Sequence, residues 1–186
     1  MPNLTIAGIG GQGVDSLAHV LGEVCHAAGL SCQYTVHKGG AQSLGSVYAE
    51  MRIDMNDHGY IGHAIPKGKL DLIVALDAWE ALRHMPMAHR QSRAWVENKI
   101  MPLFTDRGSN AIQLLPFDQI NKLPIELVYR DYQQDALNKS GTVKMANYLA
   151  GIDCLEALGI SDVALYNKHF FHNIPQARAY RGVFTA

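Results

Sequence analysis

The segment Ile6-Ala7-Gly8-Ile9-Gly10-Gly11-Gln12-Gly13-Val14 joins an apolar run to a helical pattern, and it sets the class of fold. It satisfies G-x-G-x-x-G, the pattern of a tight turn between a strand and a helix. Its glycines let the backbone turn sharply and approach a ligand closely; they are Gly8, Gly10, Gly11 and Gly13. Free N–H groups and the dipole at a helix start both favour negative charge, so the turn predicts a phosphate site.

Strand-like and helix-like segments alternate after this turn. The helical pattern from Val14 to Ala28 places its apolar side chains on one face, and Gly29 stands where a helix commonly ends. β-prone segments follow at 31–36 and 46–53, and the second alternates cleanly between apolar and polar residues. Residues 70–76 form a nearly continuous apolar run, which is typical of a central parallel strand covered on both faces.

The second half of the chain continues this alternation. Its expected elements are a helix capped by Asp77, strands at 100–105 and 111–115, a helix from 143 that Gly159 closes, and a helix from Ser161-Asp162 to about His169. Together the patterns predict an α/β fold: a three-layer sandwich with a mostly parallel, Rossmann-like sheet and a Gly-rich first strand-to-helix turn. We expect a single domain over residues 1–186.

Composition and charge exclude several classes of protein. Hydrophobic residues make up 48% of the chain and charged residues 18%, which suits one well-packed core. The net charge of -1 and the lack of a basic cluster argue against a nucleic-acid partner. No apolar run approaches the ~20 residues that span a bilayer, and no basic signal peptide opens the chain. We therefore expect a cytoplasmic protein without a membrane partner.

The cysteines and histidines do not form a metal site in the sequence. Cys25, Cys32 and Cys154 are odd in number, widely spaced and without a C-x-x-C, so neither a disulfide framework nor an iron–sulfur ligand set is expected. We interpret them as buried thiols in a reducing compartment. Two closely spaced histidine pairs lack the neighbours that would complete a metal shell: His58 with His63, and His169 with His172.

The glycine turn alone leaves several ligands open. A Rossmann domain that binds NAD has an acidic residue at the end of its second strand to hold the ribose, whereas residues 33–37 are Gln-Tyr-Thr-Val-His. NAD or NADP binding is therefore the weaker interpretation. A stand-alone nucleotide-binding Rossmann-like module, an NAD(P)-dependent oxidoreductase and a purely structural glycine turn remain as alternatives.

A second glycine-rich loop runs from His37 to Gly45. Within it, Ala41-Gln42-Ser43-Leu44-Gly45 is similar to a nucleophile elbow around Ser43, with Ala in place of the first Gly. An elbow needs a helix directly after its serine, whereas residues 46–53 have the period of a strand. A tight polar loop is favoured, and we identify no catalytic residues.

The two loops together resemble the gamma-type subunit of 2-oxoacid:ferredoxin oxidoreductases. The first match is the glycine turn, followed by Leu21-Gly22-Glu23, and the helix around Ala146-Asn147 and Gly151 is also similar. Residues 41–47 with Met51-Arg52 most resemble the beta subunit of indolepyruvate:ferredoxin oxidoreductase. The family usually has Arg-Gly-Gly after Ala-Gln, where this chain has Ser43-Leu44-Gly45.

The resemblance implies a subunit that does not bind thiamine diphosphate. The family's complexes oxidatively decarboxylate a 2-oxoacid on thiamine diphosphate, pass electrons through iron–sulfur clusters to ferredoxin and release an acyl-CoA. Thiamine diphosphate and the clusters would lie on partner subunits, and this chain would contact coenzyme A and help close the active site. The isolated chain could form a homodimer.

The residues expected to bind the cofactor come from both loops. We expect one cleft at the carboxyl ends of adjacent strands, formed by Gly8, Gly10, Gly11, Gln12, Gly13, Gly39, Gly40, Ala41, Gln42, Ser43 and Gly45.

Overall fold

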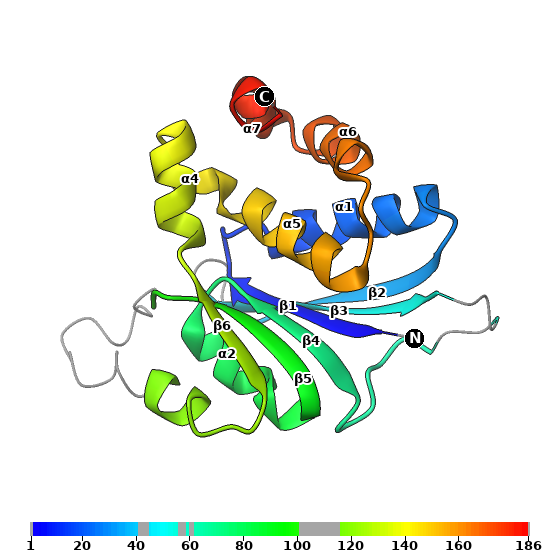
Figure 1. The fold of residues 1–186 in the computed structure, drawn as a ribbon, viewed down its shortest axis with the longest axis vertical. Coiled ribbons are helices and arrows are strands. Elements are labelled where there is room, and N and C mark those ends of the chain that lie inside the picture. Colours follow the sequence, from blue (N-terminus) through cyan, green and yellow to red (C-terminus); the bar gives the residue numbers. More distant parts are fainter. Residues whose placement is uncertain (1, 41–44, 56–58, 60–61, 101–115, 186) are drawn as a thin grey trace.

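The computed structural model describes residues 2–40, 45–55, 59, 62–100 and 116–185, and one six-stranded sheet lies at its centre (Figure 1). The strand order across the sheet is β2-β3-β1-β4-β5-β6. The strands are β1 (Asn3–Ile9), β2 (Ser31–Lys38), β3 (Ser46–Asp54), β4 (Leu70–Ala75), β5 (Ala88–Glu97) and β6 (Glu126–Arg130).

The sheet is mixed but mostly parallel. The pairs β1–β4, β4–β5 and β5–β6 are parallel. In contrast, β3 runs antiparallel to both of its neighbours, β1 and β2. The predicted mostly parallel sheet is therefore confirmed, but the antiparallel β3 lies between β1 and β2.

Helices cover both faces of the sheet, which confirms the predicted three-layer sandwich (Figure 1). On one side lie α1 (Val14–Ala27), α4 (Tyr132–Ser140), α5 (Ala146–Leu158), α6 (Val163–Asn173) and α7 (Arg181–Phe184). On the other side lies α2 (Ala78–His84), which packs against β1, β4 and β5. Short 3₁₀ helices are η1 (Met85–Met87), η2 (Val143–Met145) and η3 (Pro175–Tyr180).

Alternation along β1 divides the core into two clusters, because successive side chains of a strand point to opposite faces. Leu4 and Ile6 pack with Leu17 of α1, and all three are fully buried. Ala7 points the other way and packs with Ala75 and with the small residues of α2, which are Ala78 and Ala81. The apolar face that the sequence predicts for α1 is thus the face that covers the sheet.

Two predicted helix starts are confirmed by their caps. The Asp77 carboxylate accepts hydrogen bonds from the backbone N–H groups of Trp79 and Glu80 at 2.9 and 3.3 Å. Asp162 accepts from the Leu165 N–H at 2.8 Å. The helix that follows Asp162 ends at Asn173, beyond the predicted end near His169.

The sequence patterns miss β5, β6 and α4. The first half of β5, His89-Arg90-Gln91-Ser92-Arg93, is polar and hides the strand period. Ser92 is nevertheless buried, because its hydroxyl donates to the Leu70 carbonyl at 2.6 Å. The predicted strand at 111–115 and all but the first residue of the one at 100–105 lie outside the described residues.

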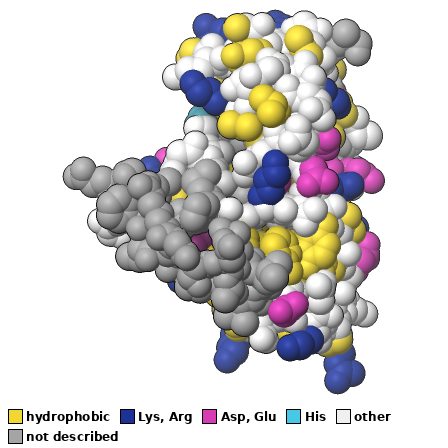
Figure 2. All heavy atoms as spheres, turned by 90° about the vertical axis from the view of Figure 1, so that its left-hand side faces the viewer, with side chains coloured by type: hydrophobic (Ala, Val, Ile, Leu, Met, Phe, Trp, Pro, Cys, Tyr) yellow, Lys and Arg dark blue, Asp and Glu magenta, His cyan; other side chains and the backbone are white. Residues whose placement is uncertain are grey.

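On the face shown in Figure 2, several Asp and Glu side chains gather near the middle of the right-hand side, and Lys and Arg side chains lie toward the top, the centre and the bottom. No helix in the described ranges is long and apolar enough to cross a membrane.

Candidate ligand-binding site

The turn between β1 and α1 adopts a conformation that requires glycine. Gly11 and Gly13 have φ angles of 101° and 80°, in the left-handed region that other residues rarely adopt. Gly13 is the N-cap residue of α1, and its carbonyl accepts from the Leu17 N–H at 2.9 Å. No described residue accepts a hydrogen bond from the N–H of Gly11 or Gly13. These two N–H groups are available to a ligand.

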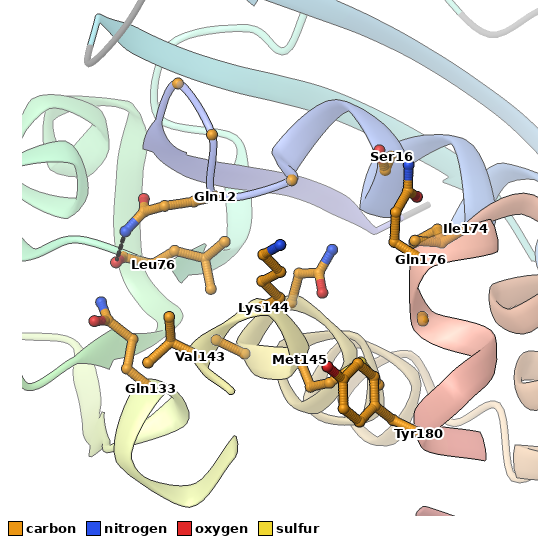
Figure 3. A pocket seen from close by; sticks show the side chains of 16 residues that line it. Gln12, Ser16, Leu76, Gln133, Val143, Lys144, Met145, Ile174, Gln176 and Tyr180 are labelled. Atoms are coloured by element: carbon orange, nitrogen blue, oxygen red, sulfur yellow. Dashed lines mark hydrogen bonds between the residues drawn. The ribbon is translucent and has the colours of Figure 1, made fainter. Parts of the chain in front are cut away.

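The side chain of Gln12 fixes the shape of this turn. Its Oε1 accepts from the Ile9 N–H at 2.7 Å, and its Nε2 donates to the Leu76 carbonyl at 2.9 Å (Figure 3). It therefore ties the end of β1 to the residue that follows β4. Gly8 makes room for it, since a Cβ on Gly8 would lie 2.7 Å from Gln12 Oε1. Gln12 and Gly8 thus shape the turn.

A cavity of about 460 Å³ opens beside the turn. Its walls come from the turn, from Leu76, from the start of α4, from η2 with the first turn of α5, and from η3 (Figure 3). Polar groups and apolar groups both line it: Lys144, Gln133 and Gln176 on one hand, and Val143, Met145 and Tyr180 on the other. Such a mixed lining suits a ligand that carries both charged and apolar parts.

Asn147 is the buried polar residue of this cavity. It lies in the first turn of α5, it is only 6% exposed, and its Oδ1 has no hydrogen-bond partner in the described part of the chain. A Cβ on Gly13 would lie 2.5 Å from Asn147 Nδ2, so Gly13 must be glycine for Asn147 to sit there. An unpartnered buried acceptor costs free energy, of the order of 1–3 kcal/mol, unless a ligand supplies the donor.

The electrostatics of the cavity favour an anion. α1 begins without a side-chain cap, and its first turn lines the cavity. η2 leads directly into α5 and is capped by Thr142, whose hydroxyl accepts from the Lys144 N–H at 3.3 Å. The N–H groups and dipole at the start of α1 favour negative charge, and the ammonium group of Lys144 adds a positive charge. Among the described lining residues there is no Asp or Glu.

A hydrogen bond joins the described parts of the two glycine loops. The Gly10 N–H donates to the Gly45 carbonyl at 2.8 Å, because Ile9 pairs with Ser46 where β3 begins. We expected the two loops to follow adjacent strands. This prediction is wrong, because the loops follow β1 and β2, and β3 lies between these two strands. Of the expected cofactor residues, Gly10, Gly11, Gln12 and Gly13 line the cavity, whereas Gly8, Gly39, Gly40 and Gly45 do not, and Ala41, Gln42 and Ser43 lie outside the described residues.

Glu97 supports one wall of the cavity from beneath. It is fully buried at the end of β5, and its Oε2 accepts from the Gln133 N–H at 3.1 Å at the start of α4. Asp131, the N-cap residue of α4, makes no side-chain cap, so Glu97 takes that role from another element. Burial raises the pKa of Glu97 to about 7. Glu97 thus positions Gln133 at the cavity wall.

Sequence patterns predict some residues of this site and miss others. The glycine turn is visible in G-x-G-x-x-G, and Asn147 belongs to the helix that carries the family resemblance. No pattern pointed to Lys144 or Gln133, because each reaches the turn only through the packing of α4 and α5. Within the described residues, no group of three or more His, Cys, Asp or Glu side chains could hold a metal ion.

Sequence comparison finds a family model that matches most of the chain and relatives that match about half of it. The family model described as pyruvate ferredoxin/flavodoxin oxidoreductase matches residues 3–165. The chain is 32% identical over 102 residues to indolepyruvate oxidoreductase subunit IorB of Methanothermobacter thermautotrophicus, covering 55% of this chain and 50% of that protein. It is 35% identical over 83 residues to IorB of Thermococcus kodakarensis, covering 45% and 40%. The chain spans about half the length of these relatives.

Solved structures share the fold at low sequence identity. The gamma subunit of a keto/oxoacid ferredoxin oxidoreductase from Geobacter sulfurreducens aligns with a TM-score of 0.69 and 16% identity, covering 100% of this chain and 95% of that chain. Pyruvate oxidoreductase subunit PORC from Thermotoga maritima gives 0.66 and 15%, covering 99% and 93%. A 2-oxoglutarate:ferredoxin oxidoreductase from Magnetococcus marinus, solved with coenzyme A bound, gives 0.69 and 14%, covering 98% and 28%.

Proposed function

Because this chain belongs to the pyruvate ferredoxin/flavodoxin oxidoreductase family, we propose that it is a subunit of a 2-oxoacid:ferredoxin oxidoreductase complex. The similarity to the IorB subunits supports an aryl pyruvate such as indolepyruvate as the 2-oxoacid. The complex would decarboxylate this acid oxidatively and pass the electrons to ferredoxin. The isolated chain is expected to be inactive.

We assign thiamine diphosphate and the iron–sulfur clusters to partner subunits of this cytoplasmic complex. Thiamine diphosphate supplies the carbanion chemistry of decarboxylation wherever it is bound. In the sequence the three cysteines lack the spacing of an iron–sulfur ligand set, which supports this assignment. Size-exclusion chromatography of the isolated chain tests whether it forms a homodimer.

We propose that the cavity beside the glycine turn binds the phosphate-bearing part of coenzyme A. The observation that carries this proposal is that the uncapped start of α1 lines one cavity together with Asn147, whose buried Oδ1 has no partner among the described residues. Phosphate oxygens would accept from the N–H groups of Gly11 and Gly13. An amide or amine N–H of the same ligand would donate to Asn147. The apolar lining would cover the remainder.

The role of this chain in the reaction is then to bind and orient the coenzyme. The N–H groups of the turn hold the phosphate, and the apolar side chains of η2 and η3 exclude water from one side of the ligand. Closing the partner's active site is part of the same proposal. A contribution from Gly39, Gly40, Ala41, Gln42, Ser43 and Gly45 stays a prediction.

Isothermal titration of the full chain with coenzyme A tests the binding. Gly11 can be replaced by Asp, which places a negative charge where the phosphate would bind. Gly68→Asp is the matched control, because Gly68 also has a positive φ, 72°, and open space around its Cβ position, but it does not line the cavity. We expect Gly11→Asp to weaken binding at least tenfold and Gly68→Asp to leave it unchanged.

Two outcomes would contradict the proposal. Equal affinity of all three proteins for coenzyme A would remove the cavity as its site. Equal affinity for pantetheine and for coenzyme A would show that the phosphates are not recognised.

The alternative is a stand-alone nucleotide-binding module or NAD(P)-dependent oxidoreductase. The topology disfavours this alternative. A dinucleotide in a Rossmann domain contacts both the glycine turn and the end of the second strand, whereas β3 separates the end of β2 from the glycine turn in this chain. Turnover of a 2-oxoacid by the purified chain with NAD(P)H would establish the alternative. Co-purification of an inactive chain with a thiamine-binding partner would exclude it.

A further inference from the structure

The segment that follows Asp162 is strongly basic. Residues 163–186 include Lys168, His169, His172, Arg178 and Arg181 and no Asp or Glu, although the net charge of the chain is -1. This segment forms α6, η3 and α7, and α6 and α7 lie on the side of α1 that faces away from the sheet (Figure 1). The family model ends at residue 165, so it does not account for this charge.

A surface cavity of about 660 Å³ brings these basic side chains together. It lies between α1, α6, η3 and α7, and α6 packs against both α1 and η3. All five basic residues of the segment line it, and Phe171, which is only 3% exposed, adds an apolar part to the lining. Small-molecule sites commonly have volumes of about 300–1,000 Å³, so the cavity has room for a compact ligand.

The fold holds Arg178 in place at the wall of this cavity. Its Nε donates to the Phe171 carbonyl at 2.9 Å, and its Nη2 donates to the His172 carbonyl at 2.8 Å. Both carbonyls belong to the last turn of α6, where a positive charge complements the helix dipole. A guanidinium group has five N–H donors, so Arg178 keeps N–H groups for a ligand while the helix end fixes its position.

The other charges of the cavity are poorly balanced. The side chains of Lys168 and Arg181 form no hydrogen bond or ion pair with another residue in the described part of the chain. The one acidic residue in the described lining is Glu23, which is half-exposed and lies with its Oε2 3.6 Å from His169 Nδ1. A single carboxylate is therefore set against Lys168, Arg178 and Arg181. Like charges that share a cavity repel one another, and a bound anion relieves this repulsion.

We propose that this cavity binds a small molecule that carries a diphosphate group. Guanidinium groups bind phosphate oxygens in pairs, and an ammonium group adds a point charge. Lys168 on α6 and Arg181 on α7 stand on different walls, so each can bind one of two linked phosphates. The concave shape and limited volume favour such a compact anion over an acidic segment of a protein.

The site is separate from the cavity beside the glycine turn. η3 lies between the two cavities: Gln176 and Tyr180 line the cavity beside the turn, whereas Arg178 lines the basic one. Coenzyme A and inorganic pyrophosphate both carry a diphosphate, so a test must distinguish the two cavities. Gly11→Asp places a negative charge at the glycine turn and leaves the basic cavity unchanged.

Isothermal titration of the full chain with inorganic pyrophosphate at low salt tests the proposal. We expect binding to persist in Gly11→Asp. In that background, Arg181→Ala and Lys168→Ala should each weaken binding at least fivefold. Arg90→Ala is the matched control, because Arg90 is also exposed but does not line the cavity. Circular dichroism shows whether each variant is folded.

A second pair of titrations tests the ligand class. Orthophosphate should bind at least tenfold more weakly than pyrophosphate, because it reaches fewer of the cations. Higher salt should weaken both, since ions screen exposed charges.

Four results would overturn the proposal. They are no binding of pyrophosphate, loss of its binding in Gly11→Asp alone, equal affinity of Arg181→Ala and Arg90→Ala, and equal affinity for orthophosphate and pyrophosphate. A glutamate-rich peptide that binds this surface when pyrophosphate does not would assign the cavity to a protein contact instead.

Discussion

The helices of this protein begin in two different ways. α2 and α6 each begin with an aspartate that caps the helix from the preceding residue, and α4 is capped by Glu97 from β5. In contrast, α1 begins with Gly13 and has no side-chain cap, and its first turn lines the cavity. The N–H groups of Gly11 and Gly13 have no partner among the described residues and are thus left for an external anion.

The largest expected effect on the free energy of unfolding is at Glu97, whose buried carboxyl caps α4. Its folded pKa of about 7 lies above its ordinary value of 4.5, so its contribution to stability is full below pH 4.5 and is lost as pH rises through 7. The loss amounts to about 3 kcal/mol. Glu97→Gln stays neutral, so it should exceed the wild type by about this amount at pH 8 and match it near pH 4.5. Urea unfolding at both pH values measures the difference.

Equal stabilities of Glu97→Gln and wild type at pH 8 would show that Glu97 is not held neutral by burial. The Glu97 cap would then depend on pH no more than the aspartate caps do.

The aspartate caps should show the next largest effect, and on stability alone. Asp77→Ala removes two accepted hydrogen bonds, and Asp162→Ala removes one. We expect losses of about 1–2 kcal/mol in the free energy of unfolding for Asp77→Ala and about 1 kcal/mol for Asp162→Ala. Thermal and urea unfolding measure both. Loss of coenzyme A affinity in these variants, with the fold intact, would mean that capped helix starts also serve the ligand.

Asn147→Ala should show the opposite behaviour, an effect on affinity alone. The variant removes a buried acceptor that has no partner in the described part of the chain, so the gain in solvation offsets the lost packing and stability should change by less than about 1 kcal/mol. Affinity for coenzyme A should fall about tenfold, which corresponds to about 1.4 kcal/mol. A large loss of stability with unchanged affinity would make Asn147 a structural residue.

The smallest effect is expected at Lys144, whose side chain is exposed at the cavity mouth. Lys144→Ala should weaken coenzyme A binding about threefold at low salt and less at high salt, because ions screen exposed charges. Lys67→Ala is the control, since Lys67 is also exposed but does not line the cavity. Titrations at two salt concentrations provide the test. A salt-independent effect would place Lys144 in direct, desolvated contact with the ligand.

The sequence predicts local features of the fold well. The glycine turn, the amphipathic α1 and the aspartate caps each depend on residues a few positions apart, and all are found as expected. In contrast, β5 is missed because Ser92 satisfies its hydroxyl through Leu70, a residue from another strand. The position of β3 between β1 and β2 likewise depends on pairing across the sheet.

The same limit applies to the site. Gly11 and Gly13 can be found from spacing alone, whereas Lys144 and Gln133 are more than a hundred residues away in the chain and reach the turn through tertiary packing. The role of Glu97 is the least visible, because its partner is a backbone N–H of a helix that the sequence patterns miss.

Gln12 has a kinetic consequence. Its two hydrogen bonds hold the glycine turn rigidly against β1 and β4 before any ligand arrives. The conformational entropy that is lost when the ligand-binding N–H groups are ordered is therefore lost during folding and not when the ligand binds. A ligand should therefore be captured in a single fast step, with no slow isomerisation after the encounter.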